Sequence, residues 1–306
     1  MKSLSDRDDV YRKYLDPEIV SRLSTMELRA RLVVEGFIIG LHRSPYHGFS
    51  IEFAEHRQYM PGDEIRHLDW KVLGRTGRYY IKQFEEETNL KSYLLIDASR
   101  SMGYSSWKHP TKLEYASYLA AALSFLMIRQ QDAVGLMVYD EKVRSYLPPH
   151  ATRSYLRQIF HQLDATKPGN RTSTSASLHE IAERIRRRGL VAIFSDLFDA
   201  PEDVMTAIRH FRHKKHEVVV FHILDPMERT FAFGSDALFR DMETGEEVAT
   251  QPWHLRAAYR EAVESFIGYY KKECREHNVE YVLLDTTTPF DVALTSYLNK
   301  RTQVNG

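Results

Sequence analysis

Short apolar runs that alternate with helical patterns, from residue 91 onward, constrain the fold of this protein more than any other feature. Six such runs occur, at residues 91–97, 133–139, 143–147, 190–194, 217–224 and 280–285. Runs of this length indicate strands, and strands that alternate with helices are typical of a mostly parallel, doubly wound sheet. The sequence therefore predicts an α/β fold.

Acidic residues follow three of these predicted strands, at Asp97, Asp196 and Asp225. A parallel sheet aligns the carboxyl ends of its strands on one edge, and open α/β sheets bind ligands at that edge. Asp97 and Asp196 are far apart in the sequence, but they meet if their strands flank the point at which the strand order reverses. We therefore predict a binding site at this edge.

The polar residues that follow the first strand offer oxygen ligands only. Ser99 and Ser101 stand two and four positions after Asp97. Carboxylate and hydroxyl oxygens suit a hard cation such as Mg²⁺, and not a soft transition metal. A later turn-rich loop adds hydroxyls, including Thr172. At residues 173–175 we favour the ordinary role of a helix N-cap, in which Ser or Thr accepts bonds from free backbone amides.

The order of these residues resembles the metal-ion-dependent adhesion site of von Willebrand factor type A domains. That site has Asp-x-Ser-x-Ser after the first strand, a Thr in a later glycine-containing loop and an Asp after the fourth strand. The matching residues are Asp97, Ser99, Ser101, Thr172 and Asp196. The resemblance implies the strand order 3-2-1-4-5-6 for the predicted strands.

The same resemblance implies a bound Mg²⁺ or Mn²⁺ ion. In type A domains the hydroxyls coordinate the metal directly, the aspartates commonly act through water, and an open position accepts a Glu or Asp side chain from a partner protein. The chain departs from the pattern after Asp196. Many type A domains have Gly there, whereas this chain has Leu197, and Asp199 could add charge or compete for the ion.

The front of the chain resembles one bacterial family in particular. Segments at residues 48–57, 61–63, 69–71, 75–76 and 82–87 are similar to the domain of unknown function 58 family, usually encoded beside MoxR-type AAA+ ATPases. The similarity runs from about Pro17 to Arg301. It implies that the partner is a MoxR-type ATPase or a client that this ATPase remodels. Longer relatives carry membrane helices ahead of this region, and this chain resembles the short soluble form.

We predict two parts in the chain. Residues 1–89 form an N-terminal helix, at about 17–39, and a small β-rich extension. Residues 90–306 form the type A-like domain, with a hairpin insertion near 236–250. The hairpin prediction rests on alternating residues on either side of a Thr-Gly turn.

Composition limits the cellular compartment of the protein and the classes of partner that it can bind. The 42 basic residues balance the 42 acidic residues, so no global charge favours nucleic acid or an anionic membrane. A single cysteine, Cys274, rules out an intramolecular disulfide and fits a reducing compartment. No apolar stretch is long enough to span a bilayer. We therefore expect a cytoplasmic protein.

Two alternatives to a metal-dependent binding module stay open. Haloacid-dehalogenase-like phosphatases also place an Asp after an apolar strand, but they need a second carboxylate where this chain has Ser99, and a hydroxyl is a poor proton donor at neutral pH. A structural module with an empty site is the other alternative, because Asp97 could cap the next helix and Asp196 could bind loop amides. We predict a non-enzymatic binding module.

Overall fold

The structure is a computed structural model that describes residues 15–43, 57–58, 74, 77, 79–81, 91–106, 109–169, 174–233, 237–240 and 247–304. The chain forms two compact units, one of residues 1–40 with 90–306 and one of residues 41–89. This division groups the N-terminal helices with the sheet, whereas the boundary predicted at residues 89 and 90 grouped them with the extension.

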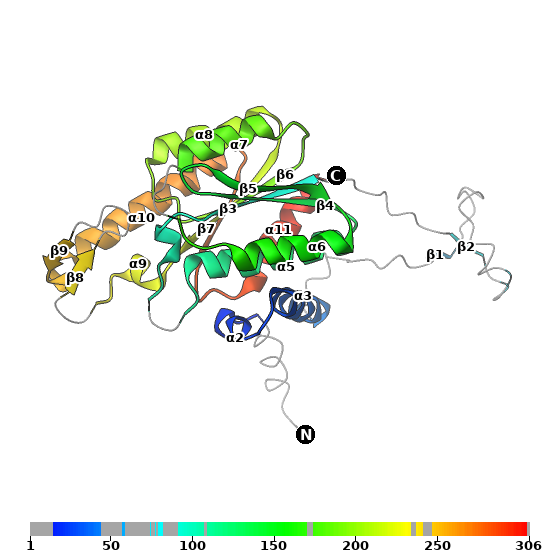
Figure 1. Ribbon diagram of the computed structural model, residues 1–306, viewed down its shortest axis with the longest axis horizontal. Helices are drawn as coiled ribbons and strands as arrows, with labels where there is room; N and C mark the ends of the chain where they lie inside the picture. The colour runs from blue at the N-terminus through cyan, green and yellow to red at the C-terminus, as the bar shows by residue number, and fades with distance from the viewer. Residues whose placement is uncertain are drawn as a thin grey trace, which may run out of the picture. The chain divides into compact units, whose positions relative to one another are not determined.

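The larger unit is built on a mostly parallel sheet, with the described strands in the order β10-β7-β6-β3-β4-β5 (Figure 1). Their bounds are β3 Lys91–Asp97, β4 Ala133–Tyr139, β5 Val143–His150, β6 Leu190–Ser195, β7 Glu217–Leu224 and β10 Glu280–Asp285. The β4–β5 pair is antiparallel and the other neighbours are parallel. Numbered along the chain, this is the predicted order 3-2-1-4-5-6, so the predicted fold class is confirmed.

The central strands are apolar along their whole length because helices cover both faces of the sheet. Every residue of β6, with the sequence LVAIFS, is buried, as expected for a parallel strand covered on both sides. One face carries α7 Thr174–Arg184, α8 Pro201–His213 and α10 Pro252–Glu276 (Figure 1). The other carries α5 Lys112–Arg129, α6 Arg153–Ala165 and α11 Phe290–Val304.

Two of these helices differ in how deeply they are buried. α5 begins with a capping box between Thr111 and Glu114 and is buried on nearly all sides, which fits a helix that is apolar all round. α10 has 25 residues but buries just Pro252, Tyr270 and Cys274. Its amino-terminal turns therefore have little core contact.

The N-terminal region of the larger unit contains two helices instead of the single helix predicted at 17–39. α2 covers Pro17–Ser21 and α3 covers Met26–Arg43. Asp16 caps α2 with Pro17 at its first turn, as the Pro signal predicts. The prediction of an unbroken helix was wrong at residues 22–25, where the chain turns between α2 and α3.

Two shorter features complete the described chain. β8 Ala237–Arg240 pairs antiparallel with β9 Glu247–Thr250, where the sequence predicts a hairpin. In the unit of residues 41–89, β1 Arg57–Gln58 pairs antiparallel with β2 Tyr80–Ile81. Most of the segments that carry the family resemblance at 48–87 lie outside the described residues. Within the described part, no helix is both long and apolar enough to cross a membrane.

Candidate functional site

The candidate site lies where the sheet changes its direction of winding. β3 and β6 are parallel neighbours, and Ile96 pairs with Phe194. The helix that follows β3 covers one face of the sheet, and the helix that follows β6 covers the other (Figure 1). This is the switch point at which open α/β sheets bind ligands. Asp97 and Asp196 follow these paired strands and lie on the same edge.

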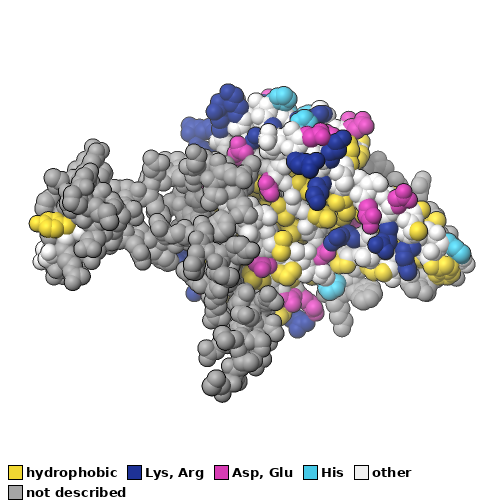
Figure 2. All heavy atoms as spheres, turned by 180° about the vertical axis from the view of Figure 1, so that it is seen from behind, with side chains coloured by type: hydrophobic (Ala, Val, Ile, Leu, Met, Phe, Trp, Pro, Cys, Tyr) yellow, Lys and Arg dark blue, Asp and Glu magenta, His cyan; other side chains and the backbone are white. Residues whose placement is uncertain are grey.

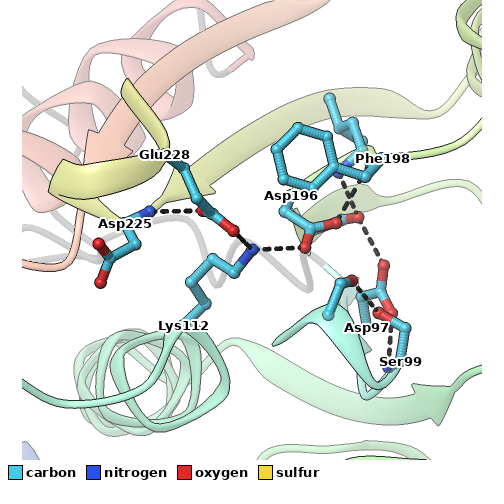
Figure 3. A network of polar contacts seen from close by, with 10 residues as sticks. Asp97, Ser99, Lys112, Asp196, Phe198, Asp225 and Glu228 are labelled. Atoms are coloured by element: carbon cyan, nitrogen blue, oxygen red, sulfur yellow. Dashed lines mark hydrogen bonds and ion pairs between the residues drawn. The ribbon is translucent and has the colours of Figure 1, made fainter. Parts of the chain in front are cut away.

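Asp97 is completely buried, and both of its carboxylate oxygens accept hydrogen bonds (Figure 3). The backbone N–H of Ser99 donates to Oδ1 at 2.8 Å, and Ser195 Oγ donates to Oδ2 at 2.6 Å. The pKa of Asp97 is raised to about 7, because burial and the charge of Asp196 raise it by more than the bonds from Ser195 and Ser99 lower it. No Lys or Arg pairs with Asp97 among the described residues.

The two serine hydroxyls lie beside this carboxylate. Ser99 Oγ and Ser101 Oγ are 3.0 Å apart, Ser99 is buried, and Ser101 begins a short 3-10 helix, Ser101–Gly103. Mg²⁺ binds oxygens at about 2.1 Å in octahedral geometry, which separates adjacent ligands by about 3 Å. The hydroxyl pair therefore has the spacing of two neighbouring ligands, and without an ion the same spacing makes a hydrogen bond.

Asp196 has a partner that the sequence analysis did not predict. The ammonium of Lys112 lies 2.8 Å from Asp196 Oδ2 and 2.6 Å from Glu228 Oε1, and the Lys112 and Asp196 side chains are fully buried (Figure 3). Burial by itself lowers the pKa of Lys112, but the two carboxylates outweigh it and raise the pKa above its ordinary value. Lys112 therefore stays charged and neutralises part of the site.

One signal in the sequence could have found Lys112. It is the first residue of α5, a helix whose other positions are largely apolar. A cation in the first turn of a helix is unfavourable with respect to the helix dipole. A lysine at that position of a core helix therefore indicates a buried carboxylate partner.

Asp225, the third acidic residue after a strand, has a structural role. Its Oδ1 accepts from the Met227 N–H at 2.8 Å, and its Oδ2 accepts from the Ser106 N–H at 2.7 Å. Glu228 Oε2 accepts from the Asp225 N–H at 2.8 Å, which completes a capping box at α9, Pro226–Thr230. Burial raises the pKa of Glu228. The capping box therefore positions Glu228 to reach Lys112.

The residue after Asp196 adopts the backbone conformation that favours glycine. Leu197 has a φ of 56° and its side chain is buried, an uncommon state for a bulky residue. Leucine in place of the type A glycine therefore strains the backbone at this position, and burial of the Leu197 side chain offsets that cost. Asp199 accepts hydrogen bonds at the amino-terminal ends of α8 and α7. Its Oδ1 accepts from the Ala200 N–H at 2.8 Å, and its Oδ2 accepts from the Ser175 N–H at 3.4 Å.

Thr172 lies outside the described residues, but the loop that leads to it is fixed. The Gly169 N–H donates to the Ala98 carbonyl at 2.6 Å. A Cβ at Gly169 would lie 2.3 Å from Asp140 Oδ2 and 3.1 Å from the Ala98 carbonyl oxygen, so a larger residue would force the Asp140 side chain to move. After the loop, the Thr174 hydroxyl is buried without a hydrogen-bond partner among the described residues. The loop therefore starts beside the residues that follow β3.

The donor set fits a hard divalent cation. In the described part of the chain, no three His, Cys, Asp or Glu side chains form a metal-binding group, so a site here depends on hydroxyls. When ionised, the carboxylates of Asp97, Asp196 and Glu228 face the single ammonium of Lys112. The surplus of buried negative charge favours a cation of two charges, with oxygen ligands.

Comparison with known proteins identifies the family. Residues 55–266 match the family described as protein of unknown function DUF58. The match covers more than half of the 306 residues, so the chain belongs to this family. The resemblance drawn from the sequence is thereby confirmed.

Individual relatives agree with this assignment. A Mycobacterium bovis protein, Uncharacterized protein Mb1516, is 28% identical over 234 residues, which are 75% of this chain and 73% of the relative. The same values hold for Uncharacterized protein MT1527 from Mycobacterium tuberculosis.

Solved structures show more distant similarity. The conserved hypothetical protein BatB from Bacteroides thetaiotaomicron has a TM-score of 0.48 and 16% identity over 70% of this chain and 99% of its own. The SpRpn10 VWA domain has a TM-score of 0.36 and 12% identity over 67% of this chain and 93% of its own. The fold assignment rests on the strand order described above.

Proposed function

We propose that this protein is a binding module, not a catalyst, and that it holds Mg²⁺ or Mn²⁺ at the carboxyl edge of its sheet. The metal residues are Asp97, Ser99, Ser101, Thr172 and Asp196. The observation that carries the proposal is a buried carboxylate, Asp97, that has no counter-charge among the described residues and lies beside two hydroxyls 3.0 Å apart.

The role of each residue follows from its contacts. Ser99 and Ser101 present neutral oxygens, and Asp97 supplies a negative charge that no Lys or Arg offsets among the described residues. Asp196 is held by Lys112 at 2.8 Å, so its charge is largely cancelled. A bound ion that meets few uncompensated charges keeps net positive character and can accept one further carboxylate oxygen. That carboxylate is a Glu or Asp of the partner.

The family membership suggests the partner. We propose that the module acts in the cytoplasm with a MoxR-type AAA+ ATPase, or with a client of this ATPase, in the assembly or maturation of proteins. A pulldown of the ATPase with and without chelator tests this step. Capture that chelation leaves unchanged would refute a metal bridge.

Calorimetric titration with MgCl₂ and MnCl₂ tests the site itself. We expect binding heat for the parent protein and its loss in the Ser99→Ala, Ser101→Ala double variant. Ser154→Ala is a matched control, because Ser154 is exposed and lies on α6. No heat with the parent would favour a structural module with an empty site. Heat that survives in the double variant would place the ion elsewhere.

An assay with a generic aryl phosphate tests the enzymatic alternative. Metal-dependent hydrolysis that Asp97→Asn abolishes would replace the binding module with a phosphatase. We expect no turnover, because the position two residues after Asp97 is a serine.

A further inference from the structure

A pocket of about 460 Å³ adjoins the candidate site. Ser101 and Glu228, which belong to the site and its ion-pair network, also line this pocket, and six of its ten lining residues are aromatic. The volume falls within the range of ordinary ligand pockets. The pocket therefore offers a largely apolar space that begins where a partner carboxylate would arrive.

The aromatic wall is a connected cluster. The ring centroids of Phe231 and Tyr259 are 4.2 Å apart, those of Phe231 and Phe239 are 5.2 Å apart, and those of Phe233 and Phe239 are 5.0 Å apart. These residues come from the segment after α9, from β8 and from α10. Three parts of the chain thus converge to build one wall.

The wall also holds a strained backbone. Phe231 ends α9 with φ 49° and ψ 40°, a left-handed conformation that is unfavourable for a residue with a side chain. The guanidinium of Arg256 donates to the carbonyls of Phe231 and Phe233, at 3.1 and 2.8 Å. Strain of this kind persists where surrounding contacts impose it, often at functional sites.

The charge available at the wall is positive. Glu228 is held by Lys112 at 2.6 Å, so its negative charge is offset. Arg240 is 69% exposed and lies 3.9 Å from Glu247, at the limit of an ion pair. Figure 2 shows hydrophobic, basic and acidic side chains close together on the described surface at the right of the view, and Arg240 is the basic residue that lines the pocket. The surface therefore complements an acidic segment with an apolar anchor.

We propose that this pocket receives an aromatic side chain of the same partner segment whose Glu or Asp reaches the metal site, an inference that rests on the proposed function. A metal ion accepts a carboxylate from any acidic residue, so the ion alone selects weakly among partners. A buried aromatic anchor supplies the missing selectivity, because such residues dominate the binding energy of interfaces. Ser101 is common to both sites, so one short segment can occupy both.

A display library of random peptides around a fixed Glu, panned on the full chain in MgCl₂, tests the inference. We expect an aromatic residue to be enriched at one fixed distance from the Glu. Replacement of that aromatic residue by Ala in the synthetic peptide should weaken binding by about tenfold or more. Replacement of the Glu by Gln should weaken binding and remove its dependence on Mg²⁺.

Variants of the protein place the contact. In Phe233→Ala, the same aromatic replacement in the peptide should weaken binding by less than about threefold, because the coupled partner is missing. Phe239→Leu keeps an apolar wall and should give an intermediate loss if Phe233→Ala folds poorly, which near-ultraviolet circular dichroism reports. Leu255→Ala is the matched control, since Leu255 is 45% exposed and does not line the pocket.

The other outcomes separate the two proposals. Enrichment of acidic residues without an aromatic residue overturns the pocket inference and leaves the metal site standing. An aromatic preference that depends on Phe233 but not on Glu or Mg²⁺ supports the pocket and overturns the metal bridge. A dimer that Phe233→Ala dissociates assigns the pocket to a second copy and overturns the inference.

Discussion

Replacement of Lys112 by Met removes the one ammonium in the buried carboxylate cluster and keeps a side chain of similar length. The parent ammonium lies 2.8 Å from Asp196 Oδ2 and 2.6 Å from Glu228 Oε1, with side-chain exposures of 0% for Lys112 and Asp196 and 17% for Glu228. Removal of one partner from a buried ion pair costs about 3 to 5 kcal/mol, because the remaining charges stay buried and unpaired. We expect a loss of this size at pH 7.

The sign of the pH dependence follows from the same contacts. Burial raises the pKa of Glu228, and Lys112 lowers it. Without the ammonium, the folded-state pKa of this carboxyl rises further above its unfolded value. An acid of this kind loses stability as the pH rises through its folded pKa. The difference between parent and variant should therefore be largest above pH 7 and smaller at pH 5.

Urea denaturation, followed by circular dichroism, measures this loss. Lys142→Met is the matched control, because Lys142 is exposed, and it should change the unfolding free energy by less than about 0.5 kcal/mol. If the single variant does not fold, a Lys112→Met, Glu228→Gln double variant should recover part of the loss. Added MgCl₂ should stabilise Lys112→Met more than the parent if the cluster binds the ion. A loss below about 1 kcal/mol at pH 7 would refute the buried ion pair.

Further predictions concern protons, backbone strain and the loop before Thr172. Because the pKa of Asp97 is raised to about 7, calorimetry should find Mg²⁺ affinity about tenfold lower at pH 6 than at pH 8, and equal affinities would count against a role for this carboxylate. Burial lowers the pKa of His222 to about 4. The unfolding free energy of the parent should therefore fall by about 3 kcal/mol relative to that of His222→Asn as the pH falls from 7 to 4. Urea titrations of both proteins measure this, and an equal pH dependence of the two unfolding free energies would contradict it. Leu197→Gly should be more stable than Leu197→Ala by about 1 kcal/mol, the reverse of the usual order, because φ is 56°. Gly169→Ala should weaken Mg²⁺ binding in calorimetry, whereas Gly268→Ala, with no atom within 4 Å of its added Cβ, should not.

The sheet and its binding edge were predictable because they depend on local pattern and on general topology. The central strands β3, β4, β6 and β7 are nearly continuous apolar runs, as burial on both faces requires. The resemblance to type A domains implied the strand order 3-2-1-4-5-6, and in the structure this order puts Asp97 and Asp196 at the ends of adjacent strands.

The ion-pair network could not be predicted in the same way. Lys112 and Glu228 lie 116 positions apart, and although a lysine at the start of an apolar helix signals a buried partner, nothing in the local sequence identifies Glu228 as that partner. Glu228 belongs to a capping motif, and the acid that leads that motif, Asp225, also looked like a site residue. Pairing between distant charges depends on tertiary structure, which no local period encodes. The same limit applies to the pocket, whose wall combines three separate segments.

The shallow burial of α10 has a consequence for how long a complex would last. Just three of its 25 residues are buried, so its amino-terminal turns are held mainly by the contacts of Tyr259 and Arg256 with the segment after α9, and they should open at lower free-energy cost than the buried helices. A peptide bound between the hairpin and the edge of the sheet would order these turns. The loss of their conformational entropy would weaken the affinity. We therefore expect a complex at this pocket to dissociate rapidly.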